Sequence, residues 1–210
     1  GPLLFAFILG DVLGAGIYAL MGVLSEKVGG MLWAPLLLAL LLAMLTAGSY
    51  AELVTKYPRA GGAAVFAERA FHSPLVSFLV GFSMLAAGVT SAAGLAIAFA
   101  GDYLGTFLDL PTIPVAIAFL ALVGLLNARG IRESMGANLV MTAIELSGLV
   151  IVVAVVAIFV GGGGGDLSRV TEAPEGTNAA IAVLSGAVIA YYSFVGFETS
   201  ANMIEEVKDP

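Results

Sequence analysis

The chain has 210 residues, of which 60% are hydrophobic and only 11% are charged. A soluble domain carries about a quarter charged residues, and one water-soluble core cannot bury this much apolar surface, so most of it must face lipid. The net charge of −7 argues against a nucleic-acid partner. The sequence has no Cys and a single histidine, His72, so it indicates neither a metal site nor a cofactor.

Six apolar segments are near spanning length, which is about 20 residues for a hydrocarbon core about 30 Å thick. Because lipid offers unpaired backbone groups no partner, we expect helices; barrel strands would be about half as long and would alternate. The sequence therefore predicts an all-α integral membrane protein with one transmembrane domain over residues 1–210. The predicted helices cover residues 3–24, 31–51, 74–101, 110–128, 136–160 and 177–204.

The basic residues of the connections predict the orientation. If the chain starts inside, the outside connections hold only Lys27 and Arg169, and six of the eight basic residues lie inside. This distribution follows the positive-inside rule, so we expect a multi-pass protein of the plasma membrane with a cytoplasmic N-terminus. The basic residues on the inside are Lys56, Arg59, Arg69, Arg129, Arg132 and Lys208.

Three connections have features of their own. Residues 61–71 (GGAAVFAERAF) could form a short interfacial helix on the inside. Residues 129–134 suggest a tight basic loop, also inside. Residues 161–178 begin with five glycines and carry acids, which predicts a flexible outside linker.

The first predicted helix contains Gly14-Ala15-Gly16 near its middle, and closely spaced glycines weaken a helix. If the helix opens there, freed N–H groups and the positive end of the following half-helix form a site for a carboxylate. The alternative is packing, because small residues also let helices approach closely. The same string fits a dinucleotide fingerprint, which we reject because its flanks are apolar and of spanning length.

The second feature lies in the sixth predicted helix, where Gly196 falls within the stretch Tyr191–Glu198. Ser193, Gly196 and Glu198 suggest a break that exposes carbonyls suited to an ammonium group. The alternative is a kinked packing helix with Glu198 near the inside interface.

Three acids fall inside the predicted spans: Asp11, Glu145 and Glu198. Each costs about 2.5–3.5 kcal/mol at a helix centre, so each should face a cavity or a partner. No Lys or Arg lies within a span to pair with them. Because hydrocarbon penalises the charged form, the three acids are candidates for proton coupling; the alternative for each is a neutral acid bonded to a neighbouring helix.

Two interrupted helices, five spans apart, are typical of transporters built from inverted repeats. Three stretches then resemble the amino acid–polyamine–organocation transporter superfamily, especially its cationic amino acid transporter-like branch. They are GDVLGAGIY (10–18), YAELVTKYPRAGGAAVF (50–66) and FVGFETSANMIEEVKDP (194–210).

The resemblance implies a leucine-transporter-type fold and proton-coupled or exchange transport of amino acids or related amines. It also implies that this chain is the N-terminal portion, namely the first five-helix repeat and helix six. By position, the backbone of Gly14, Ala15, Gly16 and Ile17 would bind the substrate carboxylate. The main chain of Tyr192, Ser193 and Val195, around Gly196, would bind the amino group.

The sequence departs from the family at one position that is linked to proton coupling. Some members carry a Lys in helix five that is proposed to gate proton coupling, and the matching position here is Glu145. That mechanism therefore does not carry over, although Glu145 could titrate in its place.

Two other functions compete with transport. A non-transporting subunit or channel would use the glycines only for packing and would keep a continuous helix through Phe194–Glu198. An intramembrane enzyme could use Asp11 and Glu145 as an acid–base pair, but no metal motif or nucleophile elbow supports it, so we expect no enzyme.

Overall fold

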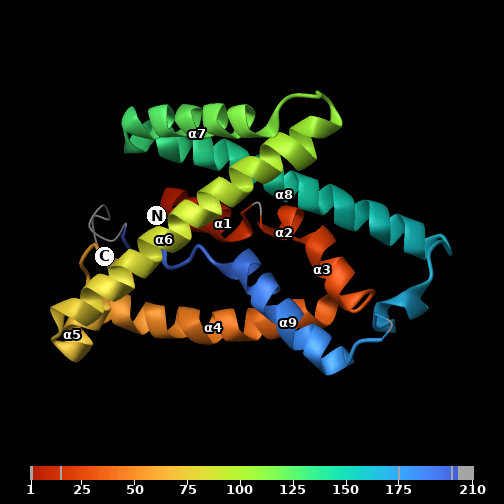
Figure 1. The fold of residues 1–210 in the computed structure, drawn as a ribbon, viewed down its shortest axis with the longest axis horizontal. Coiled ribbons are helices and arrows are strands. Elements are labelled where there is room, and N and C mark those ends of the chain that lie inside the picture. The colour runs from red at the N-terminus through yellow and green to blue at the C-terminus, as the bar shows by residue number, and fades with distance from the viewer. Residues whose placement is uncertain (1, 15, 175, 200, 203–210) are drawn as a thin grey trace. The chain divides into compact units, whose positions relative to one another are not determined.

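A computed structural model describes residues 2–14, 16–174, 176–199 and 201–202. They form helices and turns without a strand, as the sequence predicts (Figure 1). The α-helices are α1 (Pro2–Leu13), α2 (Gly16–Ala19), α3 (Met21–Val28), α4 (Trp33–Lys56), α5 (Gly62–Phe71), α6 (Pro74–Ala98), α7 (Thr112–Ala128), α8 (Ile131–Gly161) and α9 (Ala179–Tyr191). Shorter elements are the π-helical turn η1 (Phe99–Tyr103) and the 3₁₀ turns η2 (Leu104–Thr106), η3 (Leu167–Thr171) and η4 (Tyr192–Phe194).

Each predicted span overlaps a helix, and three helical segments of the described residues are long and apolar enough to cross a bilayer. They are Trp33–Lys56, Pro74–Thr106 and Gly136–Gly161. A fourth span results if the bent pair Ile8–Ala19 and Met21–Val28 crosses as one. Helix α7 and the segment Ala179–Phe194 are shorter apolar helices. Large side chains on α8 are open to the surroundings, with Val153 at 67% and Ile158 at 76% exposure, as lipid-facing positions require.

Helices α4 and α8 extend beyond the predicted spans. Helix α4 continues past Ala51 to Lys56, because Glu52, Leu53 and Lys56 are good helix formers and Pro58 follows. Helix α8 starts at Ile131, so the predicted loop at residues 129–134 is wrong beyond Gly130. Hydropathy missed this start because Arg132, Glu133 and Ser134 in its first turn are polar. The predicted helix at 61–71 is present as α5.

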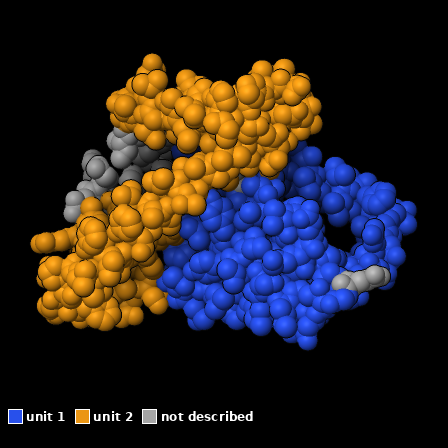
Figure 2. Space-filling view, in the orientation of Figure 1, with its two compact units in different colours: residues 1–48, 138–197 blue, residues 49–137, 198–210 orange. Residues whose placement is uncertain are grey.

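The chain divides into two compact units, each made of two stretches of sequence (Figure 2). Unit 1 comprises residues 1–48 and 138–197, and unit 2 comprises residues 49–137 and 198–210.

The core of unit 1 lies where α3, α4 and α9 meet. Leu24, Val28 and Ala39 are buried there, together with Ala182 and Ala190. Gly186 is required at this contact, since a Cβ would lie 2.9 Å from Val28 Cγ1 and 3.2 Å from Pro35 Cβ. Small residues thus bring the helices close together, as in other membrane proteins.

The core of unit 2 joins α6, η1 and α7. Ala96, Ala100 and Ala116 are buried in it. The rings of Phe99 and Phe119 stack beside them with centroids 4.5 Å apart. Alanine fills the centre of unit 2, and the two aromatic rings pack beside it.

Candidate functional site

The first predicted interruption lies between α1 and α2. Helix α1 ends at Leu13, and α2 begins at Gly16. Gly14 between them has φ +23°, a conformation that favours glycine, and its N–H still donates to the Gly10 carbonyl at 3.1 Å. Ala15, which was predicted to bind the carboxylate, lies outside the described residues. Ile17 follows Gly16 in α2 and is half-buried.

The second predicted interruption follows α9. Helix α9 ends at Tyr191 and gives way to the 3₁₀ turn η4. Val195 is extended, with φ −77° and ψ 146°, and Gly196 has φ +138°. An L side chain rarely adopts the latter conformation, so the main chain at Gly196 depends on glycine.

The two segments meet within unit 1 through their glycines. A Cβ on Gly16 would lie 3.2 Å from Ser193 Cα and 3.3 Å from Tyr192 Cδ1. A Cβ on Gly196 would overlap the Asp11 carbonyl oxygen and lie 2.8 Å from its carbonyl carbon. Main chain therefore approaches main chain, and the structure brings Asp11, Gly16, Tyr192, Ser193 and Gly196 together.

Ser193 has a property that the sequence did not predict. It is only 8% exposed, and its Oγ has no hydrogen-bond partner among the described residues. A buried hydroxyl without a partner costs about 1–3 kcal/mol, so such groups occur where a further polar group is expected. The sequence predicted a role for the Ser193 main chain, and the structure adds its side chain.

Helix α8 lies against α1 and α2 in unit 1. Gly10 faces Thr142 and Asn138, and a Cβ there would overlap Thr142 Oγ1. Gly10 is thus a packing glycine. The Tyr18 hydroxyl donates to the Glu145 carbonyl oxygen at 2.7 Å. Sequence reasoning missed Tyr18, because its partner is 127 residues away.

The three acids predicted to carry protons lie in different local settings. Asp11 belongs to the contact with Gly196, whereas Glu145 lies along α8, where its carbonyl accepts from Tyr18. Glu198 belongs to unit 2 and accepts a backbone bond from Ala201 at 3.3 Å. All three side chains are half-buried. Their proposed role in coupling remains a prediction.

Apolar helices of spanning length, exposed apolar side chains and close helix packing through small residues define a multi-pass membrane protein. The chain belongs to the amino acid permease family, whose sequence model matches residues 3–210.

Curated relatives agree with this family. The chain is 31% identical over 229 residues to "Cationic amino acid transporter 4, vacuolar" from Arabidopsis thaliana, covering 99% of the chain and 37% of the relative. It is 29% identical over 196 residues to "Low-affinity putrescine importer PlaP" from Escherichia coli strain K12, covering 92% and 43%. "Cationic amino acid transporter 9, chloroplastic" from Arabidopsis thaliana is 31% identical over 228 residues, covering 96% and 38%.

The chain thus spans less than half the length of these relatives. No solved structure matches it. The family and the relatives' names are those of transporters rather than enzymes.

Proposed function

We propose that the chain forms part of the substrate pathway of a secondary transporter for an amino acid or a related amine. One observation carries the proposal: the start of α2 meets an interrupted segment after α9 that holds a buried, unpartnered Ser193 hydroxyl. The relatives' names support the substrate class, because two are cationic amino acid transporters and one is a putrescine importer.

In this proposal the main chain at Gly14, Ala15, Gly16 and Ile17 binds a carboxylate, with the N–H groups that follow Gly14 as donors, because the Gly14 N–H donates to the Gly10 carbonyl. The first N–H groups of a helix have no acceptor within that helix, and the positive end of its dipole favours an anion. Gly16 has no Cβ, which lets the start of α2 approach Ser193 and Tyr192 closely. Backbone groups would therefore bind the part that all amino acids share.

The amino group would bind on the opposite segment. The carbonyls of Tyr192, Ser193 and Val195 lie where α9 has given way to the 3₁₀ turn and then to extended chain. Such carbonyls suit an ammonium ion, and the Ser193 hydroxyl offers a further hydrogen bond. A ligand that bonded to Ser193 would remove the cost of its burial.

The proposal extends to architecture and coupling. It includes six spans forming one transmembrane domain of the leucine-transporter type, with helices one and six broken, an inside N-terminus and placement in the plasma membrane. Names of relatives include vacuolar and chloroplastic forms, so tagging the protein in its own cell is the direct test of location. Proton coupling or exchange through Asp11, Glu145 or Glu198 belongs to the same proposal.

The competing function is a non-transporting subunit or channel that uses glycines for packing. Gly10 does pack in this way against α8. That alternative, however, requires a continuous helix through Phe194–Glu198, whereas α9 ends at Tyr191 and Val195 is extended. The second segment therefore favours transport.

Reconstitution tests the proposed function. The natural protein that contains this chain is placed in liposomes, and uptake of a panel of radiolabelled amino acids and diamines is measured with and without a pH gradient. We expect saturable uptake of at least one compound, and stimulation by the gradient if protons are coupled. If no compound in the panel is taken up or bound, the proposal is overturned.

A further inference from the structure

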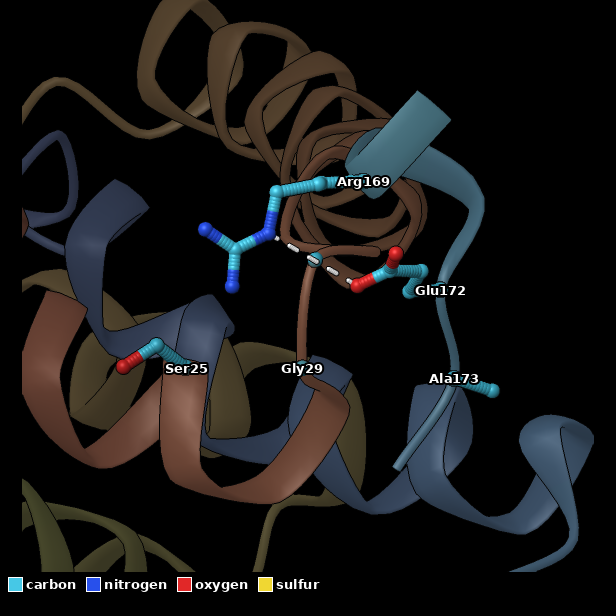
Figure 3. Close-up of a pocket in the computed structure, with 6 residues that line it drawn as sticks. Ser25, Gly29, Arg169, Glu172 and Ala173 are labelled. Carbon is cyan, nitrogen blue, oxygen red and sulfur yellow. Dashed lines mark ion pairs between the residues drawn. The ribbon is translucent and has the colours of Figure 1, made fainter. Parts of the chain in front are cut away.

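Unit 1 contains a pocket away from the segments described above, between the end of α3 and the connection that carries η3 (Figure 3). Its volume is about 430 Å³. Sites for small ligands are typically about 300–1,000 Å³, so a free amino acid fits. The pocket is lined by Ser25, Gly29, Gly30, Arg169, Glu172 and Ala173.

Two hydrogen bonds to main-chain carbonyls fix the walls of this pocket. The Gly30 N–H donates to the Glu172 carbonyl at 3.1 Å, and Trp33 Nε1 donates to the Val170 carbonyl at 2.9 Å. A Cβ on Gly30 would overlap the carbonyl oxygen of Arg169. The connection at 161–178, which the glycine run predicts to be flexible, is therefore anchored on the turn between α3 and α4.

The pocket presents one cation and one anion. Arg169 Nε lies 3.7 Å from Glu172 Oε2, and the two side chains are 74% and 60% exposed. This separation exceeds the usual limit of about 3.2 Å for a hydrogen bond. The terminal amino groups of Arg169 point away from Glu172 (Figure 3) and have no hydrogen-bond partner among the described residues.

The nearby carboxylate of Asp166 does not occupy Arg169. Asp166 Oδ1 accepts from the Ser168 N–H at 2.9 Å and from the Ser168 hydroxyl at 2.6 Å. These bonds from Ser168 hold the pKa of Asp166 below its usual range. The Asp166 carboxylate thus bonds within its own turn and makes no hydrogen bond to the guanidinium among the described residues, although the charge of Arg169 also contributes to its lowered pKa.

We propose that this pocket is an outer docking site for free amino acids, with Arg169 as the receptor for their carboxylate. A guanidinium matches a carboxylate through two parallel hydrogen bonds. The ammonium group meets Glu172 and the carbonyl end of α3, both of which favour positive charge. The inference rests on the proposed function for the identity of the ligand, and it uses none of the residues of the site at Gly16 and Ser193.

Ornithine and putrescine make the test direct, because they differ by one carboxylate. Binding of each radiolabelled compound is measured on the purified natural protein that contains this chain. Fluorescence of Trp33, the only tryptophan of the chain, gives a signal from the connection that carries Arg169, because its Nε1 donates to the Val170 carbonyl; Trp33→Phe is the blank.

Two variants separate Arg169 from overall charge. Arg169→Gln removes the receptor, and Lys27→Gln removes the other outside cation, which does not line the pocket. We expect Arg169→Gln to raise the Kd of ornithine about two- to five-fold, the range of an exposed ion pair. The Kd of putrescine and the behaviour of Lys27→Gln should stay at the wild-type level.

Equal effects of Arg169→Gln on ornithine and putrescine, or equal effects of the two variants on ornithine, would overturn the docking site. Absence of ornithine binding to the wild-type protein would overturn it as well. If the protein takes up no amino acid or amine but ornithine binding still depends on Arg169, the transport proposal fails and the docking site stands.

Discussion

Replacing Gly196 by alanine tests the contact on which the proposed substrate site depends. Two costs arise from the added methyl group. The φ of +138° becomes a strained conformation, and the Cβ overlaps the carbonyl of Asp11. Neither cost can be relieved by rotating a side chain, because both partners are main chain.

The magnitude follows from these two terms. Backbone strain of this kind costs about 1–3 kcal/mol, and forcing an extra carbon into a packed contact costs about as much again. Gly196→Ala should therefore lower the free energy of unfolding by about 2 kcal/mol or more. Any transport that uses the segment from Tyr192 to Gly196 should fall with it, because the main chain must move to accept the methyl group.

Thermal unfolding of the purified protein and uptake in liposomes measure the two effects. Gly94→Ala is the matched control, since Gly94 lies within α6 and a Cβ there meets nothing within 4 Å. Alanine in a helix interior is favoured over glycine by about 0.5–1 kcal/mol, so the control should be neutral or stabilising. If Gly196→Ala unfolds at the same temperature as Gly94→Ala and retains full uptake, the close approach to Asp11 is refuted.

Three further substitutions follow from single contacts. Ser193→Ala should weaken substrate binding while leaving the unfolding temperature unchanged or higher, because it removes a buried hydroxyl without a partner; lower stability with unchanged binding would contradict this. Tyr18→Phe removes the bond to the Glu145 carbonyl and should cost about 0.5–1.5 kcal/mol in thermal unfolding, and no change would show that α2 does not depend on this bond. Asn202→Ala removes the Oδ1 that accepts from the Gly61 N–H at 3.1 Å, so hydrogen exchange at the start of α5 should become faster; unchanged exchange would show that Asn202 does not cap α5.

The helices were predictable because lipid offers no hydrogen-bond partner to backbone groups, so a spanning segment must bond within itself. A long uncharged stretch such as 74–101 must satisfy its own backbone, so hydropathy alone located α6. The first turn of α8 was missed for the same reason, since Arg132, Glu133 and Ser134 interrupt the apolar signal there. Hydropathy locates apolar segments, and a helix can extend beyond them.

The glycine patterns predicted interruptions near Gly14 and near Gly196; α1 ends at Leu13 and Val195 is extended, but the 55° bend of the first apolar segment falls between Ala19 and Met21. They did not indicate which groups meet there. The contacts of Gly196 with Asp11 and of Gly16 with Ser193 join parts of the chain more than a hundred residues apart. Gly10 illustrates the limit, because nothing in its local sequence separates a packing glycine from one at an interruption.

The connection at 161–178 shows the opposite case. Five glycines predict a flexible segment. The composition does not indicate the hydrogen bonds that Gly30 and Trp33 donate to this segment. From the sequence alone, Arg169 was only one of the two basic residues predicted to lie outside. Its setting in a pocket depends on a turn that lies far earlier in the chain.

The alanine cores of both units have a consequence for mutagenesis. Ala39, Ala96, Ala116 and Ala190 are almost wholly enclosed, and an alanine has only one methyl group to lose. Conventional truncation scanning would therefore give hardly a signal at these four positions, whereas Leu24 and Val28 in the core of unit 1 have larger side chains to lose. Enlargement is the informative experiment: serine, valine or leucine introduced one position at a time would map which pairs of helices tolerate being pushed apart.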